Sequence, residues 1–319
     1  YVDAVNGNDD SKNVGQSWET AYKTLETAVT AAETGATIQL GAGKYTLHKK
    51  SAVTKDKDLT FVGQGADKTT WGIGATMPDP DKFGTEYNGD YSFDGAGTIT
   101  FRNMTLQSAK ADYLGFIRAD KTVVDNCIIN GKTFYWGYES ATFTNTTFNC
   151  PNKDYAIWTY SSPVMTFDNC TFNSSGKVIN VYTDYSAGKY DITVNFEDCT
   201  VKNTANNKQV LNIKDSNNDY IVNISGNNTV TGVEPNKTTC SRWFQVESVG
   251  EGKSHYATVN IDGTPVWKDG KMVSHAIDTA NDKYTDGYKD NAFTDPIYSE
   301  WTKNPDGSQS REGTKTCKY

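Results

Sequence analysis

One motif determines the fold of this chain, and its clearest copies read Ala141-Thr-Phe-Thr-Asn-Thr-Thr-Phe148 and Met165-Thr-Phe-Asp-Asn-Cys-Thr-Phe172. In every copy an apolar residue is followed, two positions later, by Asn or Asp, then by a small or soft residue, and two positions later by a second apolar residue. The other copies are Ile99-Thr-Phe-Arg-Asn-Met-Thr-Leu106, Thr122-Val-Val-Asp-Asn-Cys-Ile-Ile129 and Val194-Asn-Phe-Glu-Asp-Cys-Thr-Val201. The copies are separated by 23, 19, 24 and 29 residues. This spacing is too irregular for helical repeats, but it suits coils joined by loops of varying length.

Each copy is expected to form two short strands that meet at a corner. Alternating apolar and polar residues, enriched in β-branched and aromatic types, are typical of strands rather than helices. The central Asn or Asp interrupts the alternation because Asn tolerates left-handed backbone and hydrogen-bonds to neighbouring backbone groups. Stacked copies would align these corner residues in a ladder, which consists of Asn103, Asn126, Asn145, Asn169 and Asp198.

The position after the corner is expected to point into the core. Its residues are Met104, Cys127, Thr146, Cys170 and Cys199. We interpret these cysteines as stacked core thiols, with disulfides and metal ligation as the alternatives.

A second β segment precedes the motif in each coil. These segments are Gly115–Arg118, Phe134–Gly137, Ala156–Thr159, Ile179–Tyr182, Leu211–Lys214 and Phe244–Glu247. In them we expect Trp136, Ala156 and Trp158 to point inward and Ile157 to point outward. No segment between them is long enough for a crossover helix, so the pattern predicts an all-β fold, a parallel β-helix (solenoid) of about seven to nine coils.

The whole chain, residues 1–319, is expected to be one β-helix domain. In chain order we expect an N-terminal cap with the first coils at 1–65, a long loop excursion at 66–98, regular coils at 99–271 and a capping tail at 272–319. Helical spacing of apolar residues places a capping α-helix at Trp18–Ala32. Cys240 and Cys317 lie outside the motif, and a disulfide that fastens the tail is one use for them.

The composition excludes some partners and favours others. The 319 residues carry a net charge of −8 and no basic cluster, so we expect no nucleic-acid partner. No apolar run approaches the roughly 18 residues of a membrane span, so no membrane insertion is expected. Nineteen Tyr and seven Trp, with many Asn, Thr and Ser, suit secreted proteins that bind glycans or adhere to surfaces. We expect a monomeric module of a larger bacterial protein, secreted or on the cell surface.

Four N-terminal segments and the repeat resemble a known superfamily. The segments are Tyr1-Val-Asp-Ala-Val-Asn-Gly-Asn-Asp-Asp10, Trp18-Glu-Thr-Ala-Tyr-Lys-Thr-Leu25, Gly35-Ala-Thr-Ile-Gln-Leu-Gly-Ala-Gly-Lys-Tyr45 and Leu59-Thr-Phe-Val-Gly-Gln-Gly65. With the repeat from 99 to about 262 they resemble the pectin-lyase-like right-handed parallel β-helix superfamily, of the kind found in adhesin-like surface proteins. The resemblance implies a right-handed, single-stranded coil. It leaves function open, because that superfamily includes lyases, hydrolases, esterases and surface proteins.

The catalytic patterns of that superfamily do not carry over to this sequence. The Asn-Thr-Asp and Gly-His-Gly triplets of polygalacturonases do not occur, and the one Asp-Asp pair, Asp9-Asp10, lies in an N-terminal loop. The absence of these motifs favours a non-catalytic binding or adhesion module. It would recognise a glycan or a host glycoprotein, with immunoglobulins among the candidates.

The candidate binding residues lie at and beyond the ends of the second β segments. Tyrosines at outward or strand-end positions of neighbouring coils would form an aromatic platform for a sugar or a protein partner, flanked by charged groups. The residues are Arg118, Tyr135, Tyr138, Tyr160, Tyr182 and Asp184. Cross-strand stacking that only stabilises the sheet is the alternative explanation.

The alternative function is that of a carbohydrate-active enzyme, a glycoside hydrolase or a polysaccharide lyase. Asp120 and Glu139 occupy matching positions on adjacent coils, which lie about 4.8 Å apart. Retaining glycosidases hold their two carboxyl groups about 5 Å apart. Acidic residues at turn ends are more often simply solvated.

No metal or other cofactor is expected. The loop from Asp3 to Asp10 offers oxygen ligands for Ca²⁺, but it lacks the Glu and the spacing of an EF-hand, so we expect an ordinary turn. His48, His255 and His275 are isolated and fit no metal-binding spacing.

Overall fold

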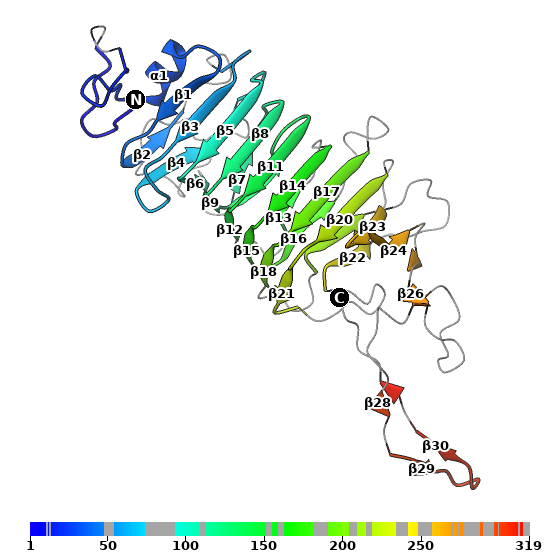
Figure 1. Ribbon diagram of the computed structural model, residues 1–319. Coiled ribbons are helices and arrows are strands. Elements are labelled where there is room, and N and C mark those ends of the chain that lie inside the picture. The colour runs from blue at the N-terminus through cyan, green and yellow to red at the C-terminus, as the bar shows by residue number, and fades with distance from the viewer. Residues whose placement is uncertain are drawn as a thin grey trace.

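The computed structural model shows a long stack of parallel strands with one short helix at its N-terminal end (Figure 1). Three sheets run along the stack, and each is named below by its number of strands. The residues that the structure describes are 1–10, 12, 14–47, 54–73, 93–108, 113–150, 155–158, 163–181, 191–203, 209–214, 219–233, 242–247, 257–268, 271–272, 275–276, 288–289, 297–298, 300–311 and 313–314.

The sheets differ in length and in where they end. The eleven-stranded sheet contains, in spatial order, β1 (Ala36–Gln39), β3 (Leu59–Val62), β5 (Thr98–Arg102), β8 (Lys121–Asp125), β11 (Ser140–Thr144), β14 (Val164–Asp168), β17 (Ile192–Glu197), β20 (Tyr220–Ser225), β23 (Ala257–Ile261), β24 (Thr264–Lys268) and β25 (Lys271–Met272). The eight-stranded sheet contains β2 (Gly43–Thr46), β4 (Thr69–Ile73), β6 (Thr105–Ser108), β9 (Ile128–Asn130), β12 (Thr147–Cys150), β15 (Thr171–Ser174), β18 (Thr200–Asn203) and β21 (Thr229–Thr231). The six-stranded sheet contains β7 (Tyr113–Phe116), β10 (Lys132–Tyr135), β13 (Tyr155–Trp158), β16 (Lys177–Val181), β19 (Leu211–Lys214) and β22 (Phe244–Glu247).

The chain passes through the three sheets in rotation. Thus β8, β9 and β10 form one coil, and β11, β12 and β13 form the next. Within the three sheets the described pairings between successive coils are parallel, and β24 and β25 at the C-terminal end pair antiparallel. The mostly β fold with long parallel sheets is the one the motif predicts, and it is compatible with a parallel β-helix.

In-register pairing stacks like residues in the core. Five apolar residues, one from each motif copy, pair directly in β5, β8, β11, β14 and β17: Phe101, Val124, Phe143, Phe167 and Phe196. All five are fully buried. The rings of Phe143 and Phe167 stack at 5.0 Å, and those of Phe167 and Phe196 at 5.1 Å. Offset aromatic stacking adds to the burial energy of each ring, so this column is a main stabilising element of the stack.

The corner residues confirm the expected ladder. All five have φ between 50° and 55°, the left-handed backbone that Asn and Asp tolerate best. The Nδ2 group of Asn126 donates to Oδ1 of Asn103 at 2.8 Å, and that of Asn169 to Oδ1 of Asn145 at 2.7 Å. Two members differ: Nδ2 of Asn145 donates to Oδ1 of Asp125, and Oδ1 of Asp198 accepts from the backbone N–H of Asn227. The position after the corner is buried in every copy, as expected.

The second β segments expected from the sequence are the strands of the six-stranded sheet. Four of these strands, β7, β10, β13 and β16, begin one or two residues earlier than expected, and β19 and β22 begin where expected. As a result, the outward orientation expected for Ile157 is wrong: Ile157 is buried and pairs with Ile179. A one-residue offset exchanges the two faces of a strand, because successive side chains point to opposite sides. Trp136 is fully buried, as expected, with its ring edge-on to Phe143 at 4.9 Å.

The N-terminal cap contains a helix shorter than the predicted Trp18–Ala32. Helix α1 spans Leu25–Ala31, and Thr24 is its N-cap, with a hydroxyl that accepts from the backbone N–H of Thr27. The carboxylate of Asp9 accepts from the backbone N–H groups of Lys23 and Thr24, which holds the preceding segment out of the helix. Among the described residues, no helix has both the length and the apolar character needed to cross a membrane.

Two of the expected boundaries are wrong. The segment 66–98 is not one excursion, because β4 lies within it and its Trp71 packs in the core against Phe61 at 4.7 Å. The regular coils end at β23 rather than at residue 271. There Asp262 and Gly263 have φ of 46° and 76°, and the chain turns back into the antiparallel strand β24.

The tail contains short paired strands. These are β26 (His275–Ala276) with β27 (Tyr288–Lys289), β28 (Ile297–Tyr298) with β31 (Gly313–Thr314), and β29 (Thr302–Lys303) with β30 (Gln309–Ser310). Cys240 and Cys317 lie outside the described residues, so their expected disulfide remains a prediction.

The corner ladder yields a first prediction. Asn169→Ala removes the hydrogen bond to Asn145 and forces a β-carbon without a compensating polar group into left-handed backbone, so we expect a loss of about 2 to 3 kcal/mol in unfolding free energy. Asn169→Gly removes the same hydrogen bond but fits the backbone, and we expect a loss of about 1 kcal/mol. Equilibrium urea unfolding measures both. Equal losses would show that the left-handed backbone contributes nothing.

A buried hydroxyl yields a second prediction. Oγ1 of Thr122, in a residue that is 1% exposed, has no hydrogen-bond partner in the described part of the chain. Thr122→Val keeps the shape and removes the desolvated hydroxyl, so we expect unfolding free energy to rise by about 1 kcal/mol. The matched control is Thr146→Val, because the equally buried hydroxyl of Thr146 donates to the carbonyl of Thr144 at 2.9 Å. That variant should lose about 1 kcal/mol, and a loss in both variants would contradict the prediction.

Candidate functional site

The predicted tyrosine row is described only in part. Tyr138 is 37% exposed, and Arg118 is half-buried on the preceding coil. Tyr135 lies in β10, of which only the backbone is described at that position. Tyr160, Tyr182 and Asp184 lie outside the described residues. The aromatic platform therefore stays a prediction.

Asp120 and Glu139 occupy matching positions on adjacent coils, as expected. The backbone N–H of Glu139 donates to the carbonyl of Asp120 at 2.8 Å, and the residues that follow them, Lys121 and Ser140, pair in register. Both side chains are exposed, and Glu139 forms an ion pair with Lys121 at 3.3 Å. This environment is that of solvated surface carboxylates. It differs from the sheltered site in which a glycosidase keeps one carboxylic acid protonated.

The loop at Asp3 forms a turn, as expected. Its Oδ1 accepts from the backbone N–H groups of Val5 and Asn6, both at 2.9 Å. The bond from the backbone of Asn6 is the main reason that the pKa of Asp3 lies below its ordinary value. Among the described residues no three His, Cys, Asp or Glu side chains form a group that could hold a metal ion.

The outer face of the eight-stranded sheet carries a regular array of uncharged polar side chains. Along these strands buried residues such as Phe148 and Phe172 alternate with outward ones. The outward residues that precede the buried ones form a hydroxyl column, in which register pairing aligns Thr70, Thr105, Ile128, Thr147, Thr171, Thr200 and Thr229. Ile128 interrupts the column of threonines, and Thr105 is buried, with its hydroxyl donating to the carbonyl of Ala66 at 2.7 Å.

A second outward column on the same face consists of amides. Its members, Gln107, Asn130, Asn149 and Asn173, pair in register, and each Nδ2 group donates to the amide oxygen of the coil before it. The distances are 3.0 Å from Asn130, 2.9 Å from Asn149 and 2.8 Å from Asn173. An amide has two N–H groups, and the ladder uses one of them, so the other remains available to a ligand. We call the two columns together the Thr–Asn face.

The outer face of the eleven-stranded sheet differs in its charge. One of its columns contains Arg102, Asp125, Asp168 and Glu197, and the guanidinium of Arg102 lies 3.8 Å from the carboxylate of Asp125. By contrast, the Thr–Asn face carries no charged side chain from β4 to β15. Of the two faces, the Thr–Asn face is therefore the one that presents only neutral side chains from β4 to β15, with Lys44 next to Thr70 and Lys202 next to Asn173 at its limits.

Sequence reasoning missed the Thr–Asn face, although its signal lies in the motif itself. The triplets Thr147-Phe-Asn149 and Thr171-Phe-Asn173 repeat at the end of two copies, and their first and third residues point outward. Because these residues belong to the repeat that builds the fold, the sequence gives no reason to separate them from residues with a purely structural role.

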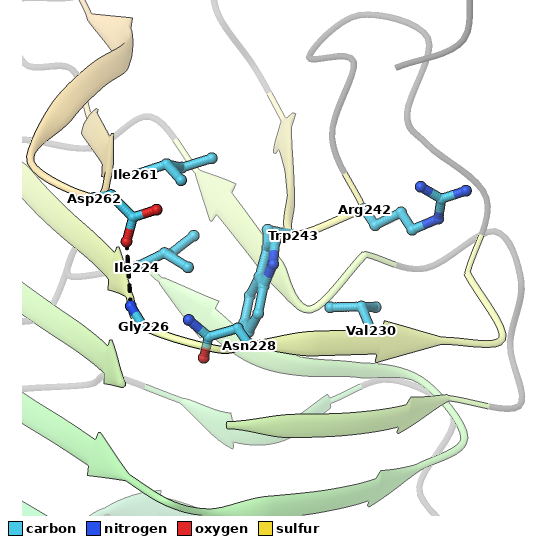
Figure 2. Close-up of a pocket in the computed structure, with 8 residues that line it drawn as sticks. All are labelled: Ile224, Gly226, Asn228, Val230, Arg242, Trp243, Ile261 and Asp262. Atoms are coloured by element: carbon cyan, nitrogen blue, oxygen red, sulfur yellow. Dashed lines mark hydrogen bonds between the residues drawn. The ribbon is translucent and has the colours of Figure 1, made fainter. Parts of the chain in front are cut away.

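A cavity of about 440 Å³ opens at the C-terminal end of the stack (Figure 2). Its apolar wall is formed by Ile224 and Val230 of the last complete coil, by Ile261 of β23 and by Trp243. Two charged residues, Arg242 and Asp262, lie on opposite sides of Trp243. Pockets that combine an apolar wall with a few convergent polar groups are typical ligand sites.

Comparison with known proteins does not identify a family. No protein-family model, no curated protein and no solved structure matches this chain.

The cysteines of the core yield a third prediction. Cys127, Cys150, Cys170 and Cys199 are buried thiols, and burial raises the pKa of Cys127 to about 12. Because burial keeps a reagent away from all four sulfur atoms, these thiols should resist a disulfide reagent at pH 8 in the folded protein and react once it unfolds in guanidinium. A Cys240→Ser, Cys317→Ser double variant removes the two other cysteines. Rapid labelling of that folded variant would contradict the prediction.

Proposed function

We propose that this chain is a right-handed parallel β-helix of the pectin-lyase-like superfamily that serves as a non-catalytic binding domain of a secreted or cell-surface protein. Its ligand would be a neutral glycan bound along the Thr–Asn face. The observation that carries this proposal is the uncharged double column of hydroxyl and amide groups, repeated once per coil.

The repeat of the face suits a polymeric ligand. Successive coils lie about 4.8 Å apart, so a polysaccharide chain lying along the stack meets the same hydroxyl and amide groups at each step. Sugar hydroxyls both donate and accept hydrogen bonds, and so do the Thr hydroxyls and Asn amides. Many weak contacts of this kind add up along a chain, which allows a shallow face to bind without a deep pocket.

Charge argues for a neutral glycan rather than an acidic one. The chain carries a net charge of −8 and would repel a polyanion at low salt. Within the Thr–Asn face no Lys or Arg lies between β4 and β15 to offset that repulsion, and the first cation along the amide column is Lys202 in β18.

The enzyme alternative draws less support. It depends on Asp120 and Glu139, which lie outside the Thr–Asn face and are exposed, with Glu139 paired to Lys121. A binding domain needs neither carboxylate.

The fourth prediction tests the face directly. Thr147→Glu should weaken retention on neutral polysaccharides at least tenfold in affinity electrophoresis, because the new carboxylate replaces a hydroxyl contact and has no partner on the face. The matched control is Thr142→Glu, which lies in the same coil and is equally half-buried, but points outward from the eleven-stranded sheet. That variant should bind like the parent protein.

Four outcomes would count against this proposal. One is no retention on any neutral glucan, xylan, mannan or glycan-array spot, and another is equal loss in both variants. The third is hydrolysis of an oligosaccharide that disappears in Asp120→Asn or Glu139→Gln, which would favour the enzyme instead. Binding of an immunoglobulin that survives deglycosylation would favour a protein partner.

A further inference from the structure

The eleven-stranded sheet extends one coil further than the eight-stranded sheet. Strand β23 pairs in parallel on β20, but no described strand pairs on the outer edge of β21. Within the described residues the eight-stranded sheet therefore ends one strand short of the eleven-stranded sheet at the C-terminal end of the stack.

Strand β24, which covers the C-terminal end of the stack, leaves the outer edge of β21 open. After the turn at Asp262 and Gly263, β24 folds back antiparallel to β23, and its Trp267 packs edge-on against Phe244 of the six-stranded sheet at 6.0 Å. Trp267 and Val266 are buried there. The cover thus closes the core beside the six-stranded sheet, while the cavity next to β21 remains.

The backbone of β21 is oriented to accept another strand. The backbone N–H of Thr229 donates to the carbonyl of Cys199, so the backbone groups of Thr229 face β18. Along a parallel strand, successive residues direct these groups to opposite neighbours, so the N–H and C=O of Val230 face the open edge. The side chain of Val230 is half-buried, whereas Val201, its counterpart one coil earlier, is fully buried beneath β21.

Opposite charges flank the open edge at its two ends. Asp262 accepts from the backbone N–H of Gly226, just before β21, at 3.2 Å. Arg242 donates through Nε to the carbonyl of Val233, just after β21, at 3.1 Å. Figure 2 shows the two charged groups on either side of Trp243, with Val230 below the arginine. A strand added parallel to β21 would thus begin beside a carboxylate and end beside a guanidinium.

We propose that the open edge of β21 binds an extended peptide segment of a partner protein as an added parallel strand. The segment carries a basic residue at its N-terminal end, an apolar residue over Val230 and an acidic residue at its C-terminal end. Main-chain hydrogen bonds to Val230 supply the affinity, and the cavity with Asp262 and Arg242 selects the sequence and its direction. This site is separate from the Thr–Asn face.

The test uses two blocked peptides of equal composition and the full 319-residue chain. Acetyl-Lys-Thr-Val-Thr-Glu-amide places its charges beside Asp262 and Arg242, and acetyl-Glu-Thr-Val-Thr-Lys-amide reverses them. We expect the first to bind at least tenfold more tightly in fluorescence anisotropy at low salt. Arg242→Gln and Asp262→Asn should each reduce that preference, and Asn suits the left-handed backbone at position 262.

N-methylated peptides test the strand geometry. By the pattern of β21 on β18, the second Thr of the peptide donates its N–H to the carbonyl of Val230, while the N–H of the peptide Val points away. Methylating the nitrogen of that Thr should weaken binding at least tenfold, and methylating the nitrogen of Val should not. Equal effects, no preference between the two charge orders, or no binding at millimolar peptide would each overturn the proposal. Concentration-dependent dimerisation that either peptide fails to disrupt would assign the edge to a second copy of the chain.

Discussion

Parallel pairing in register is the constraint on which the rest of this structure depends. It places each side chain about 4.8 Å from its counterpart in the next coil, so every residue must tolerate a copy of itself as its closest neighbour. Aromatic rings satisfy this condition by stacking, as Phe143, Phe167 and Phe196 do. Amides satisfy it because each both donates and accepts a hydrogen bond. Asn173 donates to Asn149, and Asn149 donates to Asn130. Like charges satisfy it poorly, and the register pair of Asp168 and Glu197 on the eleven-stranded sheet is a contact of that kind.

The same constraint explains how the stack ends. The corner before β21 contains three residues, 226–228, where the corner before β18 contains two, 198–199. Gly226 then occupies left-handed backbone without a side chain to extend the ladder. Asp198 has no amide N–H to donate, so it accepts instead from the backbone of Asn227 at 2.6 Å. With the ladder ended, the next corner at Asp262 reverses the chain, and the eight-stranded sheet stops at β21.

The sequence predicts those features that a single coil encodes. The strand, the left-handed corner and the buried position after it all follow from eight adjacent residues, and each was found where the motif placed it. The second strands follow loops of varying length, so no local pattern fixes their offset, and the orientation of Ile157 was predicted wrongly. The cavity was not predictable because its wall joins Val230, Trp243 and Ile261, which come from separate passes of the chain. The Thr–Asn face was missed for the opposite reason, since its residues belong to the repeat that defines the scaffold.

A repeating face and a unique end impose different limits on recognition. A ligand on the Thr–Asn face meets nearly the same groups after a shift of one coil, so several positions along the stack have similar free energies. Such degeneracy favours avidity for a long polymer over the choice of one particular sequence. The end of the stack has no such degeneracy, because among the described strands the eight-stranded sheet has one free edge there, that of β21, and Asp262 and Arg242 flank it. Sequence-specific recognition in this molecule therefore belongs to the place where the repeat is broken.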